Sequence, residues 1–555
     1  QCGTGNWYTG RSHNKSGRRR ASQENWGGRL WPFPVAPGGV SLSQLSSFSL
    51  SVIKFRVPSI EAVLVRSLAS PGLAIHKNTL NTQIRDYFDR IAPDIDRWQH
   101  RNRYYYQDLE KLHQFLIPAG SRVLEIGSGT GHLLGSVNPA VGVGIDFAPA
   151  MVQLAARHYP HLTFYCAEAE TLTPADLAPN HRRFDYIILS GGLGYFSDIQ
   201  RVLQQLQPFC MPSTRLILTF HNFLWEPLLS LAENIGQRRP QPPQNWLSMD
   251  DVANLLTITD FIPLKRGRRF LIPKRLPGLS YLVNRYISPL PGIKHLSLTN
   301  YVVARPQPDL VSAPARPSCS VVIPARNEAG NIRAAVDRLP PLGSDTEIIF
   351  VEGHSQDPTW HEIQRLVQTY PGPYRIRAFQ QTGRGKADAV RLGFQEARGD
   401  ILMILDADLT VPPEDLPHFV DVLASGRGEF INGSRLVYPR SRQAMPWLNT
   451  AANKFFALMF SFLLEQPLKD TLCGTKVLWR QDYNRIAAGR QYFGDFDPFG
   501  DFDLLFGAAK LNLQIVEVPI RYQPRSYGES NIAHVKEGLV LLKMCAYASR
   551  KLKFW

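Results

Sequence analysis

Two carboxylate side chains stand two residues apart at the end of an apolar run, in the string LMILDAD at residues 402–408. The run predicts a buried strand. Because Asp406 and Asp408 leave this strand together, both carboxylates can converge on one Mg²⁺ or Mn²⁺ ion, which prefers oxygen ligands. Such an ion neutralises the charge of a leaving diphosphate. Asp406 and Asp408 are therefore the candidate metal ligands.

A second candidate site is the string VLEIGSGTG at residues 123–131, where strand-like residues lead into a glycine-rich turn and then a helix. Glycine lets the backbone approach a ligand closely, and the start of a helix presents free N–H groups. Asp146 ends the next predicted strand, where an acid can bind ribose hydroxyls. Glu168 follows the third predicted strand. This order favours a nucleoside-containing ligand.

Strand-like and helical patterns alternate in two series, which must position these residues. Strands are expected at residues 123–126, 141–145, 163–165, 186–189 and 216–220, and again at residues 320–323, 347–351, 401–405 and 429–432. Such alternation predicts parallel sheets covered by helices on both faces. The motifs of the two series differ, so we expect two different α/β domains.

The composition divides the chain further. We predict a basic leader at residues 1–80 that is disordered or not native to the protein, with a targeting peptide as the alternative. The first domain then spans residues 81–305, a proline-rich linker residues 306–317, and the second domain residues 318–532. Residues 533–555 predict a basic amphipathic helix at the C-terminus.

The glycine-rich turn with its two acids resembles the class I S-adenosylmethionine-dependent methyltransferases, over roughly residues 81–305. This resemblance implies a Rossmann-like sheet and S-adenosylmethionine as cofactor. It implies cofactor binding by Glu125, Gly127, Ser128, Gly129, Gly131, Asp146 and Glu168. Residues 190–195 should line the acceptor side, and His221 and Asn222 are candidate polar groups there. The methyl acceptor stays unidentified.

The strings VVIPARNE (321–328), EGHSQD (352–357) and GRGKADA (383–389) accompany the two acids of the second site. Together they resemble the inverting glycosyltransferases of family 2, and within them the polyprenyl-phosphate (dolichyl-phosphate) mannosyl- and glucosyltransferases. This resemblance implies a GT-A type α/β domain and a metal held by Asp406 and Asp408. It implies that the nucleotide-diphospho-sugar is bound by Pro324, Ala325, Asn327, Glu328, Glu352, Lys386 and Asp388. Arg435 and Arg525 match family arginines near phosphates, a task suited to a planar guanidinium.

Two departures from the family pattern leave the substrates open. The usual D-D-G-S is EGHS at residues 352–355, and a cysteine, Cys473, replaces the serine of the D-x-x-S-G segment. A polyprenyl phosphate is already an anion and needs no base, and it is the acceptor we expect. The alternative is a hydroxyl of a polysaccharide or small molecule, for which Asp501 or Asp503 would be the general base.

The chain has 62 Lys and Arg against 47 Asp and Glu, a net charge of +15. The leader and residues 261–300 each carry a net charge of +8, so the rest of the chain is close to neutral. Residues 261–300 hold eight basic residues and no acid. Residues 261–296 are either a solvated insertion between the last two strands or a contact with an anionic membrane surface. For the C-terminal helix, the alternatives are an interfacial helix on the membrane and a helix docked on the domain. No nucleic-acid partner is expected, because no recognised binding module accompanies the basic residues.

No apolar run is long enough for a transmembrane helix. The six scattered cysteines without a C-x-x-C pair favour a reducing compartment. We therefore expect a cytoplasmic protein, peripheral on the cytoplasmic face of a membrane. The prediction is a bifunctional enzyme whose two domains act in one glycan or lipid pathway, and its rival is a non-catalytic basic membrane scaffold.

Overall fold

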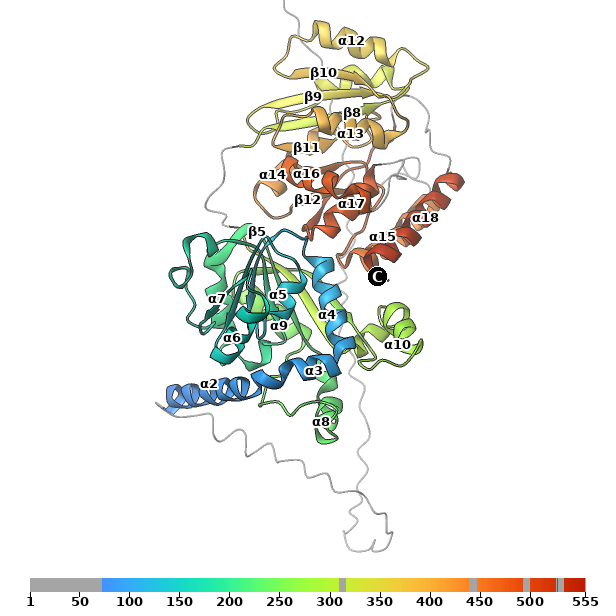
Figure 1. Ribbon diagram of the computed structural model, residues 1–555. Helices are drawn as coiled ribbons and strands as arrows, with labels where there is room; N and C mark the ends of the chain where they lie inside the picture. Colours follow the sequence, from blue (N-terminus) through green and yellow to red (C-terminus); the bar gives the residue numbers. More distant parts are fainter. Residues whose placement is uncertain are drawn as a thin grey trace, which may run out of the picture. The chain divides into compact units, whose positions relative to one another are not determined.

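The computed structural model describes residues 72–308, 316–438, 447–492, 500–525, 527 and 534–554. Residues 71–555 form one compact unit that contains two seven-stranded sheets (Figure 1). This confirms the predicted α/β class and the two different sheets. Residues 1–71 of the predicted leader and 309–315 of the predicted linker lie outside the described residues.

The first sheet has the strand order β3-β2-β1-β4-β5-β7-β6. Its strands are β1 (Arg122–Ile126), β2 (Val141–Asp146), β3 (Thr163–Cys166), β4 (Phe184–Ser190), β5 (Cys210–His221), β6 (Phe261–Arg269) and β7 (Thr299–Pro306). The first five are parallel, and β7 is antiparallel to both β5 and β6. Ile126 pairs with Ile145 and with Leu189, so β1, β2 and β4 end at the same level. The chain reverses its direction across the sheet at β1 and β4, which is where ligands bind in such folds.

Alternation along β1 divides its side chains between two apolar layers. Leu124 and Ile126 pack beneath α7 (Ile199–Leu206) and α9 (Met249–Ile258), while Val123 packs against α4 (Arg103–Leu116) and α5 (His132–Ser136). Both faces of the sheet are thus covered, as its apolar strands require. The remaining helices are α2 (Gly72–Ile91), α3 (Ile95–Arg101), α6 (Pro149–His158), α8 (Glu226–Asn234) and α10 (Leu279–Leu282). The predicted domain start near residue 81 falls inside α2.

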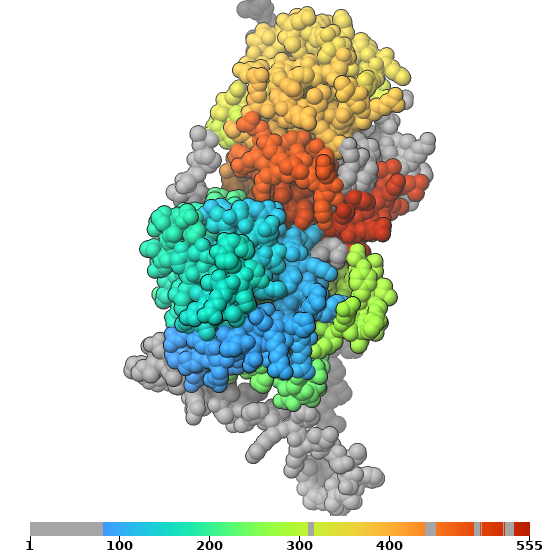
Figure 2. Space-filling model, viewed as in Figure 1, coloured from blue at the N-terminus to red at the C-terminus, as the bar shows by residue number. Residues whose placement is uncertain are grey.

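The basic segment is only partly the insertion that was expected. Residues 261–269 form β6, so Lys265 and Arg269 belong to the sheet. Lys265 is buried, and Arg269 forms a two-pronged ion pair with Asp108. The surface part runs from Phe270 to Leu298 and includes α10 and the π-helical turn Val283–Ile287, a projecting part of the surface in yellow-green in Figure 2.

The second sheet has the order β10-β9-β8-β11-β13-β12-β14. Its strands are β8 (Cys319–Ala325), β9 (Thr346–Glu352), β10 (Arg375–Gln380), β11 (Ile401–Ile404), β12 (Phe430–Ser434), β13 (Lys476–Trp479) and β14 (Ile515–Pro519). β8 to β11 are parallel, whereas β13 is antiparallel to both β11 and β12. Its helices are α11 (Ile332–Asp337), α12 (Thr359–Thr369), α13 (Lys386–Glu396), α14 (Leu416–Ala424), α16 (Arg480–Ala488) and α17 (Asp501–Lys510).

Two long helices, α15 (Trp447–Leu464) and α18 (His534–Leu552), complete the second half and pack against each other (Figure 1). Phe460 of α15 and Met544 and Ala548 of α18 are buried in its apolar core. The C-terminal helix is therefore docked on the domain, while Leu458 and Leu539 on these helices remain exposed. Within the described ranges, no helix is long and apolar enough to cross a membrane.

Buried polar contacts join the residues of the two sheets. Arg215 of β5, with 2% of its side chain exposed, donates to both carboxylate oxygens of Glu429 at 2.8 Å and to the carbonyl of Asn512 at 2.8 Å. Arg305 of β7 lies 3.3 Å from the same Glu429. Lys265 of β6 donates to Oδ1 of Asn512 at 2.7 Å. The two halves thus share a buried ionic network.

Candidate active sites

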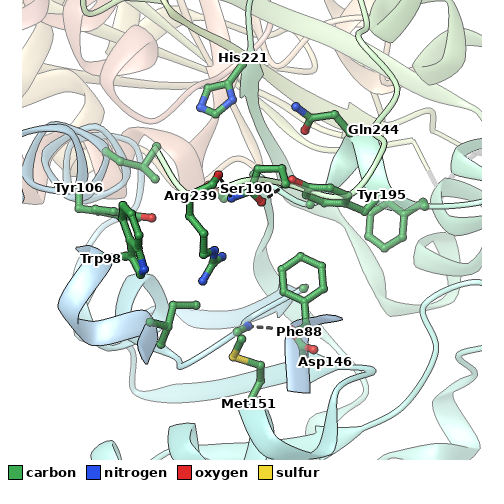
Figure 3. A pocket seen from close by; sticks show the side chains of 18 of the residues that line it. Phe88, Trp98, Tyr106, Asp146, Met151, Ser190, Tyr195, His221, Arg239 and Gln244 are labelled. Carbon is green, nitrogen blue, oxygen red and sulfur yellow. Dashed lines mark hydrogen bonds between the residues drawn. The ribbon is translucent and has the colours of Figure 1, made fainter. Parts of the chain in front are cut away.

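A cavity of about 410 Å³ opens where β1, β2 and β4 end (Figure 3). Four of the residues predicted to bind a cofactor line it, namely Gly127, Gly129, Asp146 and Glu168. Gly127, Gly129 and Gly131 all have positive φ, between 52° and 74°, which glycine adopts without strain. An added Cβ at Gly127 or Gly129 would meet no atom within 4 Å, so the turn presents bare backbone to the cavity.

Asp146 fixes the shape of this turn. Its Oδ2 accepts a hydrogen bond from Gly129 N at 2.8 Å, and its Oδ1 accepts one from Ala148 N at 2.9 Å. Burial raises the pKa of Asp146 despite these hydrogen bonds. The acid expected to bind ribose thus also orders the turn that faces the ligand.

Three of the predicted cofactor residues, Glu125, Ser128 and Gly131, are not in the lining of the cavity. Glu125 is buried beneath the turn and accepts a hydrogen bond from Leu134 N in α5 at 3.1 Å. Burial raises the pKa of Glu125 to about 8, so it is protonated at neutral pH. At Gly131 a Cβ would lie 2.6 Å from the ring of Phe164, so this glycine permits close packing.

Aromatic and cationic side chains also line the cavity. Trp98, Tyr106 and Phe88 come from the N-terminal helices, and Arg239 from the segment between α8 and α9 (Figure 3). His221 at the end of β5 lies 3.2 Å from the hydroxyl of Tyr105. Burial, with a smaller effect of Arg238, lowers the pKa of His221 to about 4, so this imidazole is neutral. The N-terminal helices and Arg239 had no motif by which sequence reasoning could find them.

Asn222 has a structural task. Its amide donates to the carbonyls of His295 and Ser297, and its Oδ1 accepts from Leu224 N. It therefore ties β5 to the segment before β7 and is not in the lining of the cavity.

The second site lies where β8, β9 and β11 end, because Ala325 pairs with Glu352 and Val322 with Ile404. Asp406 follows β11 and forms an ion pair with Lys386 Nζ at 2.7 Å. Asp408 accepts hydrogen bonds from Thr410 Oγ1 at 2.9 Å and from Arg525 Nη2 at 2.9 Å. The two acids that the sequence singled out are thus held by cations from distant segments.

Arg525 connects the two sides of this site. Its Nη1 donates to Glu328 Oε1 at 2.7 Å, while its Nη2 donates to Asp408. Burial and the negative charge of Asp406 raise the pKa of Asp408, and Arg525 opposes this. Burial likewise raises the pKa of Glu328. The site therefore favours added positive charge.

The turn after β8 and the segment after β9 hold each other. Asn327, with a φ of 57°, accepts from Gln356 N at 2.7 Å and donates its own N–H to Ser355 Oγ at 3.0 Å. Burial alone would raise the pKa of Glu352, but hydrogen bonds from Ser355 lower it. Pro324 and Ala325 end β8 beside this turn. The motifs at residues 321–328 and 352–357 thus form one wall.

The third motif supplies the opposite wall. Asp388 accepts a hydrogen bond from Gly383 N at 2.9 Å, which closes the turn before α13 and presents Lys386 to Asp406. Gly474 approaches the same ion pair, because an added Cβ there would lie 2.0 Å from Asp406 Oδ2 and 2.4 Å from Lys386 Nζ. A Cβ at this position would therefore displace the Asp406–Lys386 ion pair.

Arg435 is tied to an acid instead of standing free for a phosphate. Its Nε and Nη2 donate to the two carboxylate oxygens of Asp470 at 2.7 and 2.8 Å. Burial alone would raise the pKa of Asp470, but the charge of Arg435 lowers it to about 2. Among the acceptor-side acids, Asp503 is buried between Arg391 and Arg490. Asp501 begins α17, and its side chain lies outside the described part of the chain.

Within the described residues, no group of three or more His, Cys, Asp or Glu side chains is placed to hold a metal ion. Asp406 and Asp408 are a pair of carboxylates, which suffices for Mg²⁺ when the substrate supplies further oxygens. The carboxylate oxygens of this pair and the raised pKa of Asp408 fit such an ion.

Comparison with known families divides the chain as its two sheets do. Residues 98–262 match the family model described as a methyltransferase domain. Residues 320–486 match the model described as glycosyl transferase family 2. The first match covers β1 to β5 and ends where β6 begins, and the second covers β8 to β13 and ends before β14.

Similar proteins are found for the second half. The dolichol-phosphate mannosyltransferase of Pyrococcus furiosus is 28% identical over 219 residues, which covers 38% of this chain and 58% of that protein. The enzyme of the same name from Saccharomyces cerevisiae is 38% identical over 110 residues, covering 19% of this chain and 40% of that protein. The undecaprenyl-phosphate 4-deoxy-4-formamido-L-arabinose transferase of Edwardsiella ictaluri is 24% identical over 221 residues, which covers 39% of this chain and 63% of that protein. The chain thus spans about half the length of these relatives.

Proposed function

We propose that this chain, which combines a methyltransferase domain with a family 2 glycosyltransferase domain, is a bifunctional transferase. Its second domain transfers a sugar from a nucleotide-diphospho-sugar to a polyprenyl phosphate, with inversion at the anomeric carbon. Its first domain transfers a methyl group from S-adenosylmethionine to an acceptor of the same glycan or lipid pathway. The observation that carries this proposal is the cluster of Asp406, Asp408, Lys386, Glu328 and Arg525 at the ends of parallel strands.

The donor site divides its tasks between two walls. The wall of Pro324, Ala325, Asn327, Glu328 and Glu352 binds the nucleotide. The facing wall, with Lys386 and Asp388, adjoins the diphosphate. Lys386 and Arg525 are paired with the two acids, so a diphosphate can take over these cations when it enters. Arg435 supports this wall through Asp470.

Asp406 and Asp408 would hold a divalent cation, Mg²⁺ or Mn²⁺, through their carboxylate oxygens. When bound, it supplies positive charge that stabilises the leaving diphosphate. The residues of the chain hold the carboxylates in place, because Thr410 and Arg525 both donate to Asp408. The raised pKa of Asp408 supports a requirement for added positive charge there.

The names of the relatives support a polyprenyl phosphate acceptor. A phosphate oxygen is already ionised and needs no general base. The second candidate, a sugar or small-molecule hydroxyl, needs a base. Asp503 is occupied by two arginines, so Asp501 would have to serve. If activity falls about 100-fold in Asp501→Asn, as the loss of a general base predicts, the hydroxyl acceptor is favoured.

In the first domain, S-adenosylmethionine is held by Gly127, Gly129, Asp146 and Glu168. The space beside the turn glycines lets a ligand come close to the backbone. When bound, this cofactor supplies an electrophilic methyl group. The aromatic side chains of the N-terminal helices cover the cavity and exclude water. Neutral His221 and Tyr105 are placed on the acceptor side to hydrogen-bond an acceptor hydroxyl.

Exposed apolar side chains support contact with an anionic membrane surface. Leu279, Tyr281 and Leu282 of α10 are each 53% exposed, with Arg275, Arg285 and Lys294 in the same segment. Apolar side chains beside cations are typical of interfacial segments. We place this contact on the cytoplasmic face, where the anionic lipids of the leaflet meet such segments.

Two binding measurements test the proposal domain by domain. Calorimetry of the full chain should detect S-adenosylhomocysteine at one site, lost in Asp146→Ala, and a nucleotide diphosphate at another, lost in Asp408→Ala. The matched controls are Asp185→Ala and Asp415→Ala, which lie away from both sites. If neither ligand binds, the chain is a non-catalytic scaffold.

A further inference from the structure

The charges around the cofactor cavity are unevenly distributed. Among its acids, Asp146 is the last residue of β2, and Glu168 and Glu170 follow β3. The other described residues of the lining include the cations Arg238, Arg239 and Lys274 and no further acid. In Figure 3, Asp146 lies at one end of the cavity and His221 at the other, with the guanidinium of Arg239 between them. The acceptor side of the cavity is therefore positive.

Arg239 has hydrogen-bonding capacity that the described part of the chain does not use. Its Nε and Nη1 are buried and have no hydrogen-bond partner among the described residues. Its guanidinium stacks over the ring of Tyr87 at 5.4 Å, which fixes its orientation. Buried donors without partners are costly, and a planar guanidinium suits carboxylate and phosphate oxygens. Arg238, by contrast, is paired with Glu233.

A second cleft, of about 820 Å³, adjoins this cavity. The two share Asn102, Pro273 and Lys274 in their linings. The cleft is lined by the basic side chains His100, Arg101, Arg103, Lys274 and Arg275, and none of the described residues in its lining is Asp or Glu. Clefts lined by charges of one sign concentrate ligands of the opposite sign. Lys274, at the junction, thus connects a basic entrance with the acceptor side of the cavity.

We propose that the methyl acceptor is an anion that enters through this basic cleft and binds Arg239 and Lys274 through a phosphate or carboxylate group. This proposal rests on the methyltransferase function and deepens it by stating the class of acceptor. A sugar attached to a lipid phosphate, the product proposed for the second domain, belongs to this class. Soluble sugar phosphates belong to it as well.

The test is calorimetry of the full chain saturated with S-adenosylhomocysteine. The probes are mannose 1-phosphate and a short-chain polyprenyl phosphate mannose, with neutral methyl mannoside as the uncharged comparison. Arg239→Gln should weaken binding of the anionic probes at least about tenfold, the usual effect of losing a charged hydrogen bond. Arg239→Lys should restore part of it. The difference between wild type and Arg239→Gln isolates this cavity from any binding in the second domain.

Matched variants separate the site from general charge effects. Arg266→Gln removes an exposed cation from β6 outside both linings and should leave binding unchanged. The double variant Arg101→Gln/Arg275→Gln should weaken anion binding and make it less sensitive to salt, because the entrance loses charge. The double variant Arg157→Gln/Arg182→Gln removes the same charge from exposed positions outside the cleft. It should change neither the affinity for the anionic probes nor its sensitivity to salt.

The outcomes separate the two proposals. If S-adenosylhomocysteine does not bind, the methyltransferase function fails. If it binds and the anionic probes bind Arg239→Gln as well as wild type, or no better than methyl mannoside, the anionic acceptor is wrong. If only the lipid-linked probe binds, the acceptor is a glycolipid. If mannose 1-phosphate binds too, a sugar phosphate is sufficient for recognition and the lipid is not needed.

Discussion

Gly474 is the residue at which the second site is most sensitive to a single added atom. A Cβ there would lie 2.0 Å from Asp406 Oδ2 and 2.4 Å from Lys386 Nζ, both at the ends of flexible side chains. These side chains can move away at little cost in stability, but the ion pair is then displaced. Gly474→Ala should leave the free energy of unfolding within about 1 kcal/mol and lower sugar transfer about 100-fold, as misplaced groups do. Chemical denaturation and a transfer assay measure both.

The control for this change is Gly489→Ala, where the nearest atom to an added Cβ is 3.6 Å away. It should alter neither quantity. If Gly474→Ala transfers sugar at the wild-type rate, Asp406 and Lys386 do not form the donor site.

The Arg435–Asp470 pair determines how one buried acid responds to pH. The charge of Arg435 lowers the pKa of Asp470 to about 2, below the ordinary value of 3.8. A lowered folded-state pKa contributes stability that is fully present above pH 4 and is lost as pH falls toward 2. Asp470→Asn should cost about 3–5 kcal/mol at pH 7, because it leaves a buried guanidinium without its partner.

Urea denaturation at several pH values measures this effect. The difference in stability between wild type and Asp470→Asn should shrink as pH falls below 4. A difference that is constant down to pH 2 would contradict the pairing. Asp337→Asn, at the exposed Arg333–Asp337 pair, is the control and should change little.

Residue types at motif positions could be predicted from the sequence, but their partners could not. Asp408 and Glu328 were assigned from local strings, yet Arg525 bridges them from 197 residues beyond Glu328. Arg435 was assigned to a phosphate by its motif, whereas its position beside Asp470 depends on a loop that packs against β12. Such pairings arise from tertiary packing and leave no periodic signal in the sequence.

At the scale of elements, all nine predicted strands are confirmed; eight are largely buried, and the ninth, β3, lies at the edge of the first sheet. Five strands were missed. β6 carries Lys265 and Arg269, whose charges are buried through contacts with distant groups, so its sequence reads as a basic surface. β10 lies at the edge of its sheet and contains Arg375 and Arg377. The apolar-run criterion misses strands that carry charged residues, whether at a sheet edge, as in β10, or with buried partners, as in β6.

Helices α15 and α18 provide a prediction for membrane contact. Leu458 is 75% and Leu539 64% exposed, whereas the opposite faces of both helices are buried. Burying a leucine side chain contributes about 1.5–3 kcal/mol, so Leu458→Gln and Leu539→Gln should each weaken vesicle binding about tenfold or more. Co-sedimentation with vesicles containing anionic lipid measures this.

Val367→Gln, on α12, removes an exposed apolar side chain from a helix that has no part in the proposed contact. It should leave vesicle binding unchanged. If the two leucine variants bind vesicles like wild type, these helices do not face the membrane.

For the whole molecule, the buried ionic network between the two sheets predicts cooperative unfolding. Glu429 neutralises Arg215 and Arg305, whose side chains are almost fully buried. Glu429→Gln should destabilise the chain by about 3–5 kcal/mol, since two buried cations lose their partner. Glu414→Gln, at the exposed pair with Arg338, should change stability by no more than about 0.5 kcal/mol.

Differential scanning calorimetry provides the readout. Wild type should unfold in one transition over residues 71–555, and Glu429→Gln should separate it into two. Two transitions already present in wild type would show that the network does not couple the sheets.

The proposed glycosyltransferase activity is tested most directly by sugar transfer to a lipid with the purified full chain. It is incubated with Mn²⁺, a polyprenyl phosphate and each of a set of nucleotide-diphospho-sugars, and the lipid is analysed by mass spectrometry. We expect one added hexose-type mass on the lipid phosphate with at least one donor, and its loss with Asp408→Asn and after removal of the metal. Absence of transfer from every donor, while a dolichol-phosphate mannosyltransferase is active in the same assay, would contradict it.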